Sequence, residues 1–226
     1  MNTTEQYISI FNSYIELLSS LSKGESRVSD GSQILSVLNK IQMDNDCHLM
    51  IRYAHRGGHG DKSWLYCYKG DKDTYEEEYE KRMKDSLDFF VCYNYDEIFN
   101  VFNHVKVESS EMGAWQAYLL SVATHFLPTC GHGAYSKWTF MPSYEQLKAK
   151  IDRITFRKPQ NVPVFEDLSP SVKIEGNKAT ISCCYWNNWG GLVRRTEQIL
   201  FINNRAYFIE DGSREVLVKY DCGVRY

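Results

Sequence analysis

Residues 172–222 read VKIEGNKATISCCYWNNWGGLVRRTEQILFINNRAYFIEDGSREVLVKYDC and carry the clearest structural pattern in the chain. Short apolar runs alternate there with pairs of Asn, Asp and Gly, which tolerate the positive φ angles of tight hairpin turns. Neither face of the apolar runs is plainly polar, so we expect helices to cover the sheet on both sides. The pattern predicts a meander of about five antiparallel strands, over residues 172–175, 178–186, 192–202, 205–210 and 214–222.

Upstream of the meander, the sequence predicts helices and one β-hairpin. Residues 47–54 and 63–68 alternate in hydropathy around a glycine-rich turn, which is typical of a hairpin. Apolar residues recur elsewhere at helical spacing. Together these elements place the chain in the α+β class, with N-terminal helices and a hairpin, central helices, and a C-terminal antiparallel meander packed against helices. The predicted helices cover residues 7–21, 34–41, 74–87, 89–126 with breaks near 94–96 and 108–110, and 143–152.

A proline-rich segment offers one candidate domain boundary. Three of the five prolines of the chain lie between residues 157 and 170. Such a segment is typical of a linker or of a crossing between domains. We therefore expect either a single α+β domain over 1–226 or two domains, a mainly helical one with a hairpin over 1–156 and the meander over 157–226.

The order of the predicted elements is helix, helix, hairpin, helix and meander. This order resembles that of the cone-shaped α+β fold of nuclear-transport-factor-2-like proteins, enlarged by the helices of 89–152. The resemblance is one of topology and covers about two thirds of the chain. Because that fold hosts enzymes, binding proteins and structural proteins alike, it implies an architecture and no particular activity.

Charge and hydropathy exclude some classes of partner. The formal net charge is −3 and the basic residues are scattered, whereas nucleic-acid binding needs clustered Lys and Arg. No apolar run approaches the roughly 18 residues that span a bilayer. The chain has seven cysteines, an odd number that cannot all pair within one chain, and most of them lie in apolar segments. This pattern is typical of reduced thiols. We expect a cytoplasmic protein that binds neither nucleic acid nor membrane.

The predicted hairpin loop contains one candidate metal or catalytic site. His55, His59 and Asp61 lie within seven residues, together with three glycines that let the backbone fold around an ion. Either histidine is also a candidate acid or base. The alternative is a plain glycine-rich turn, because flexible glycines remove the fixed ligand spacing that a helix provides.

A second candidate follows the central helices. Cys130 and His132 flank a glycine and offer a thiol beside an imidazole, the groups of a nucleophile and its base. Neighbours two residues apart rarely reach each other productively, since catalytic pairs are usually assembled from distant segments. A helix C-cap, with a glycine in the left-handed conformation, is the alternative.

The meander contains the candidate binding residues. Trp186 and Trp189 surround a predicted turn, where an indole contacts a partner or packs locally. Polar residues then interrupt the apolar strand over 194–198, and Arg194, Thr196 and Gln198 alternate with Arg195 and Glu197. If the sheet curves around a cavity, one of these two alternating sets of side chains lines the cavity and the other faces solvent. An edge strand, where charge blocks aggregation, explains the same residues without a ligand.

We therefore expect non-catalytic binding of a small molecule or a protein partner through a helix-covered curved sheet. The predicted contacts are Trp186, Trp189, Arg194, Thr196 and Gln198. The alternative is an enzyme of hydrolase or lyase type that uses His55, His59 or His132, with or without a metal. A purely structural homo-oligomer is a third interpretation. The sequence specifies no cofactor.

Overall fold

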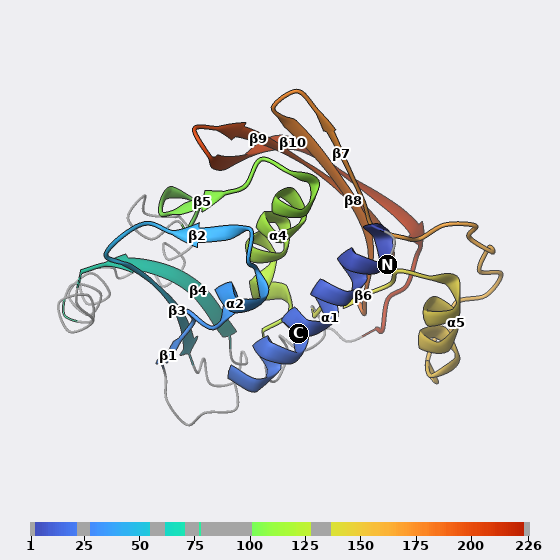
Figure 1. Cartoon of the computed structure of the whole chain (residues 1–226). Helices are drawn as coiled ribbons and strands as arrows, with labels where there is room; N and C mark the ends of the chain where they lie inside the picture. The colour runs from blue at the N-terminus through green and yellow to red at the C-terminus, as the bar shows by residue number, and fades with distance from the viewer. Residues whose placement is uncertain are drawn as a thin grey trace.

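The computed structural model describes residues 3–21, 28–54, 62–70, 77, 101–127 and 137–223 (Figure 1). Helices and antiparallel strands both occur in these ranges, which confirms the α+β class predicted from the sequence. The strands form a five-stranded, a three-stranded and a two-stranded sheet.

The C-terminal sheet contains the predicted meander. Its strands β7 to β10 follow one another along the chain and pair antiparallel, and β6 extends the edge of β8 beyond β7. The predicted turns at Gly176–Asn177 and Asn203–Asn204 are present, with positive φ at Gly176 and at both Asn203 and Asn204. The five strands are β6 Thr139–Phe140, β7 Ser171–Glu175, β8 Lys178–Asn187, β9 Gly191–Ile202 and β10 Arg205–Val218.

The meander has four successive strands where the sequence predicts five, because the predicted strands 205–210 and 214–222 form the single strand β10. The sequence predicts a turn at Asp211–Gly212, but these residues lie inside β10. Ile209 pairs with Gln198 and Ser213 pairs with Thr196, so three residues of β10 stand opposite Glu197 alone. The segment is a bulge, because β9 is long enough to pair on both sides of it and this pairing outweighs the local turn preference.

The predicted hairpin is confirmed and belongs to a separate sheet. Strand β3 pairs antiparallel with β4, and β1 pairs with the other edge of β3. A two-stranded sheet, β2 with β5, lies between this hairpin and α4 (Figure 1). The strands are β1 Val28–Asp30, β2 Ile41–Met43, β3 Cys47–Ala54, β4 Lys62–Lys69 and β5 Val105–Val107.

Two predicted helical segments are corrected by the structure, while the predicted helix over 74–87, apart from Glu77, and the part of the next one over 89–100 lie outside the described residues. The region that follows Asn100 is a 3-10 turn, η3 Val101–Asn103, and then strand β5, because its two buried valines alternate with an exposed lysine and pair with β2. The second predicted helix is short, α2 Ile34–Val37. The chain turns after it, with the Ile41 amide donating to the Leu38 carbonyl, and Ile41 opens β2.

The remaining helices match their sequence signals. Helix α1 Thr3–Leu21 buries the predicted apolar stripe, Tyr7, Phe11, Tyr14 and Leu18. Ser110 and Ser143 act as N-caps, each accepting a hydrogen bond from a backbone amide of the first turn. They open α4 Glu111–Ser121, which leads into the short η4 Ala123–His125, and α5 Tyr144–Asp152.

Helices cover both faces of the C-terminal sheet, but one of the two faces is covered only at the end that holds Cys184, Trp186 and Leu192, so the predicted coverage is confirmed in part. Helices α1 and α4 lie on one side of its long strands and α5 lies on the other (Figure 1). The larger core joins Trp115 of α4 to Ile199 of β9, and the smaller core joins Leu147 of α5 to Trp186 of β8. The two sides of one strand pair therefore belong to different cores.

Candidate functional site

The register between β8 and β9 determines which side chains share a face of the sheet. Cys183 lies opposite Arg195, and Tyr185 lies opposite Val193. Cys183 and Tyr185 belong to the larger core, so we call their side of the sheet the inner face. Residues alternate along a strand, so Arg195 and Glu197 project to the inner face.

A cavity of about 280 Å³ lies at the inner face beside the bulge of β10. Its size is close to the lower end of small-molecule sites, roughly 300 Å³. The bulge contributes Gly212 and Ser213 to the wall, so the irregular pairing of β10 shapes the cavity. The lining residues are Trp138, Tyr185, Asn187, Val193, Arg195, Glu197, Gly212, Ser213 and Arg214.

Arg195 is held between an aromatic ring and a carboxylate. Its guanidinium carbon lies 5.2 Å from the centroid of the Trp138 ring, which is cation–π distance. Its Nε donates a hydrogen bond to the Glu197 carboxylate, and only 12 % of the Glu197 side chain is exposed. Among the described side chains, Glu197 is the carboxylate that accepts from Nε of Arg195, and the terminal nitrogens of Arg195 lie at the cavity.

His125 forms the other side of the aromatic stack. Its ring lies parallel to Trp138, with centroids 3.8 Å apart and an interplanar angle of 3°. Burial, and secondarily the positive charge of Arg195, lowers the pKa of His125 to about 4. The imidazole is therefore neutral near pH 7 and adds no charge beside Arg195.

Two glycines make room for the charged groups. A side chain at Gly212 would place its Cβ 2.6 Å from Oε2 of Glu197, and one at Gly190 would place its Cβ 2.9 Å from Nη2 of Arg214. Gly212 therefore lets the Glu197 carboxylate lie against the bulge. The Asn187 amide oxygen accepts hydrogen bonds from the backbone amides of Trp189 and Gly190, which fixes the turn beneath Arg214.

A buried thiol lies behind the cavity wall. The Cys183 sulfur is 3.3 Å from the hydroxyl oxygen of Tyr118 and 3.0 Å from that of Tyr185. Burial raises the pKa of the Cys183 thiol to about 12. A thiol in this state is protonated near pH 7 and is a poor nucleophile, so Cys183 packs as a small core residue.

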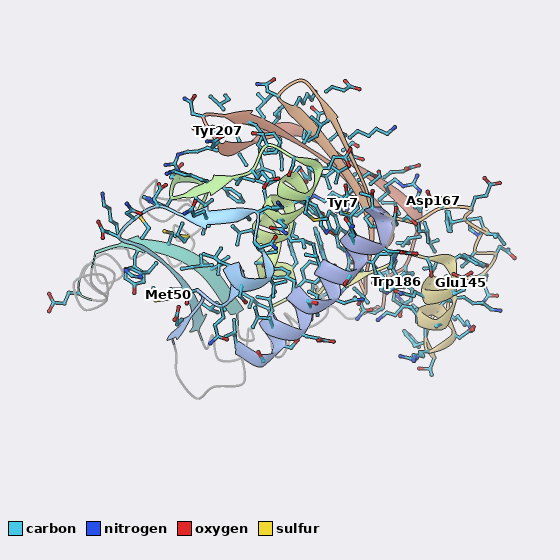
Figure 2. All side chains as sticks on the ribbon, in the orientation of Figure 1. Tyr7, Met50, Glu145, Asp167, Trp186 and Tyr207 are labelled. Atoms are coloured by element: carbon cyan, nitrogen blue, oxygen red, sulfur yellow. The ribbon has the colours of Figure 1, made fainter. Side chains whose placement is uncertain are left out.

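The structure places the predicted binding residues away from this cavity. Trp186 is 0 % exposed in the smaller core, and its ring centroid lies 5.1 Å from that of Tyr220 (Figure 2). Arg194 donates to the backbone carbonyl of Asp167 and lies on the outer face, which Thr196 and Gln198 share by alternation. Trp189 is half-buried in the turn between β8 and β9. The cavity instead gathers Arg195 and Glu197, the alternate set of the same strand.

The remaining predicted site residues lie outside the described ranges. His55, His59 and Asp61 fall between β3 and β4, and Cys130 with His132 falls between η4 and β6. The metal and catalytic hypotheses built on them therefore stay predictions.

One sequence signal distinguishes the cavity residues from their neighbours. Arg195 and Glu197 alternate along β9 in step with three apolar residues, so all five project to the same face. These apolar residues are buried, and they are Val193, Ile199 and Phe201. A charged pair on the apolar face of a strand needs partners within the protein, because burying a lone charge is costly. The position of Arg195 and Glu197 on this face therefore indicates a structured polar site. Trp138 and Arg214 carry no comparable local signal in the sequence.

No helix in the described part of the chain has the length and apolar composition needed to cross a membrane. Comparisons of the chain with models of known families, with curated proteins and with solved structures find no match.

Proposed function

We propose that this protein is a non-catalytic binding protein that holds a small carboxylate or phosphate ligand in the cavity on the inner face. The observation that carries the proposal is the pair of arginines, Arg195 and Arg214, that line one cavity of about 280 Å³. Guanidinium groups match carboxylate and phosphate oxygens through paired hydrogen bonds. Binding neither nucleic acid nor membrane, and a cytoplasmic location, belong to the same proposal.

The neighbours of Arg195 support a binding role. Glu197 takes one donor and fixes the guanidinium plane, while Trp138 supports its face. Such a side chain loses little conformational freedom when a ligand arrives, which favours affinity. Glu197 compensates the charge of Arg195, so Arg214 supplies the excess positive charge that an anion requires.

The protonation states near the cavity favour binding over acid–base catalysis. A general acid or base works best with a pKa near the ambient pH. The pKa of His125 is lowered to about 4 and that of Cys183 is raised to about 12, so each keeps one protonation state near pH 7.

The test is a titration of the purified protein with inorganic phosphate and, separately, with citrate, at constant ionic strength. Tryptophan fluorescence follows binding, since Trp138 touches Arg195. We expect saturable binding of at least one anion. Loss of a charged hydrogen bond should weaken it roughly 10-fold to 100-fold in Arg195→Gln and in Arg214→Gln.

Arg194→Gln is the matched control, because Arg194 is the preceding residue on the same strand and faces the other side of the sheet. It should bind as the wild type does. The double variant Arg195→Gln/Glu197→Gln removes the partly buried pair without leaving one charge alone, and it should fold and fail to bind. The proposal is wrong if neither anion binds saturably, or if Arg194→Gln weakens binding as much as Arg195→Gln.

A further inference from the structure

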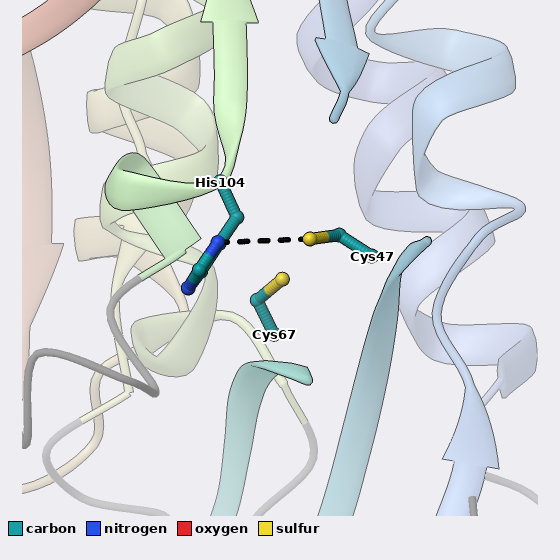
Figure 3. Close-up of side chains that lie close together, drawn as sticks. All are labelled: Cys47, Cys67 and His104. Atoms are coloured by element: carbon teal, nitrogen blue, oxygen red, sulfur yellow. Dashed lines mark hydrogen bonds between the residues drawn. The ribbon is translucent and has the colours of Figure 1, made fainter. Parts of the chain in front are cut away.

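Two thiols and one imidazole come together at the end of the N-terminal hairpin (Figure 3). Sγ of Cys47, Sγ of Cys67 and a ring nitrogen of His104 all lie within 4.8 Å of one another. Nδ1 of His104 is 3.6 Å from Sγ of Cys47. Both cysteines are buried and His104 is half-buried, so the cluster is shielded from bulk water.

The pairing of β3 with β4 brings the two cysteines to the same face. Leu49 pairs directly with Cys67, and Cys47 precedes Leu49 by two residues. Residues two apart on a strand project to the same side, so Cys47 and Cys67 are diagonal neighbours on one face. Neither forms a disulfide in the structure.

Backbone hydrogen bonds hold the third residue against this pair. The amide of Asp44 donates to the carbonyl of His104 at 2.8 Å, and the amide of Cys47 donates to the carbonyl of Asp44 at 3.2 Å. The amide of Gly70, just after β4, donates to the carbonyl of Asp46 at 3.0 Å. The segments that carry all three side chains are thus fixed by main-chain contacts.

The spacing of the donor atoms suits a tetrahedral zinc ion. Zinc lies about 2.3 Å from a cysteine sulfur and about 2.0 Å from a histidine nitrogen, so tetrahedral geometry separates sulfur from nitrogen by about 3.5 Å. The observed distance from Sγ of Cys47 to Nδ1 of His104, 3.6 Å, is close to this value. Two sulfurs in the same geometry lie about 3.8 Å apart, within the span of the cluster.

We propose that Cys47, Cys67 and His104 bind a zinc ion, with both sulfurs and Nδ1 as ligands. Two thiolates and an imidazole form a donor set that favours zinc over magnesium or calcium, which prefer oxygen. On binding, the two S–H bonds break, the protons pass to solvent, and each thiolate donates an electron pair to the metal. Two thiolates neutralise the charge of Zn²⁺, which makes the buried complex electrically neutral.

The ion adds a link between elements that main-chain hydrogen bonds already hold close together. Cys47 opens β3, Cys67 lies near the end of β4, and His104 directly precedes β5, which pairs with β2. Zinc therefore links the three-stranded sheet to the two-stranded sheet. Within the described ranges the cluster supplies three ligands, so the fourth position is taken by water or by a residue beyond those ranges. The cavity under Arg195 shares no residue with this site, and the two proposals stand independently.

The first experiment measures metal uptake by the full chain. After treatment with a chelator and a thiol reductant, the protein is titrated with Co²⁺ alone and the visible spectrum is recorded. We expect about one Co²⁺ per chain, with intense d–d bands of tetrahedral coordination and a thiolate charge-transfer band, and displacement by an equal amount of Zn²⁺. Weak octahedral bands without charge transfer would overturn the proposal.

Variants assign the ligands. Cys47→Ser, Cys67→Ser and His104→Asn should each lower the affinity for Co²⁺ at least about 100-fold and, for the cysteines, weaken the charge-transfer band. Cys222→Ser and His48→Asn are the controls, because Cys222 lies elsewhere and His48 is exposed on the opposite face of β3. Both controls should bind like the wild type. Unchanged tetrahedral binding in Cys47→Ser/Cys67→Ser would assign the metal to other residues.

A labelling experiment on the unmutated protein covers the case in which a ligand variant fails to fold. The protein is treated with iodoacetamide with and without Zn²⁺, and the labelled cysteines are mapped by peptide mass spectrometry. We expect zinc to slow labelling of Cys47 and Cys67 at least about tenfold and to leave Cys222 unaffected. Equal labelling with and without zinc, or a Cys47–Cys67 disulfide that persists after reduction, contradicts the proposal.

Discussion

On the C-terminal sheet, two residues of the same type that are adjacent in sequence lie on different faces and have different surroundings. Cys183 contacts tyrosine hydroxyls in the larger core, whereas Cys184 lies in the smaller core. Arg195 is held by Trp138 and Glu197 at a cavity, whereas Arg194 reaches a backbone carbonyl at the surface. Side-chain type alone therefore does not determine role in this sheet, because adjacent residues of a strand point to different layers.

The largest expected effect comes from removing Trp186 from the smaller core, compared with Trp189 in the following turn. Trp186 fills the smaller core and is 0 % exposed, so Trp186→Ala should lower the free energy of unfolding by about 4 kcal/mol. Trp189, half-buried in the next turn, should lose less than half as much on the same change. Urea unfolding followed by circular dichroism measures both. Equal losses would contradict the greater contribution assigned to the buried Trp186.

The second comparison concerns the two arginine–glutamate pairs. Glu197→Ala leaves Arg195 without its partner in a partly buried site and should cost about 2 kcal/mol. Glu215→Ala breaks the exposed pair with Arg194, 3.7 Å apart, and should cost less than about 0.5 kcal/mol. Chemical unfolding measures both. If Arg195→Gln/Glu197→Gln is no more stable than Glu197→Ala, the cost does not arise from the charge left alone.

The third test measures how stability depends on pH, and it concerns the stacked rings of His125 and Trp138. Because burial lowers the pKa of His125 to about 4, the unfolded chain binds a proton more readily, and stability should fall as pH drops from about 6.5 towards 4. The loss attributable to His125 between pH 7 and pH 5 should be about 2 kcal/mol.

His125→Phe keeps a ring against Trp138 and removes the titrating group, so its stability should fall less steeply over this interval. Urea midpoints at several pH values measure the difference. His48→Asn, which removes an exposed imidazole on β3, should keep the slope of the wild type. An unchanged slope in His125→Phe would mean that His125 does not carry the effect.

The smallest expected effect distinguishes Gly212, which lines the cavity, from Gly190, which lies in the turn beside it. Gly212→Ala pushes against the Glu197 carboxylate, which Arg195 holds, and should cost about 1 kcal/mol. Gly190→Ala meets the end of the exposed Arg214 side chain, which can move aside, and the Asn187 side-chain amide at 3.1 Å, so it should cost about 0.5 kcal/mol, less than Gly212→Ala. Thermal unfolding measures both, and the reverse ranking would contradict the described position of Glu197.

Strands and helix caps could be predicted where the signal is local. The Asn and Gly pairs at 176–177 and 203–204 form turns in the structure, and Ser143 caps α5 as its spacing from Gln146 indicates. The Asp211–Gly212 signal failed because β9 continues past it and pairs with both flanks of the bulge. A local turn preference is worth less than the backbone pairing of a long strand.

The candidate sites could be predicted only in part. Alternation along β9 separates Arg195 and Glu197 from Arg194 and Thr196, but it does not say which set faces the helices. Predicting the cluster of Cys47, Cys67 and His104 requires the register of the hairpin, whose two strands are separated by seven residues. It also requires the position of β5. A loop of that length permits several registers, so the sequence does not bring the two sulfurs together.

The amino-acid order alone establishes the α+β class, the apolar stripe of α1 and the alternation of the long strands, because hydropathy period and turn chemistry act over a few residues. Only the packed molecule selects Arg195 for the cavity and gathers the two thiols with His104. These outcomes depend on strand register and on which helix lies over which face. Both are set by contacts between residues far apart in the chain, whose combined burial outweighs any local preference.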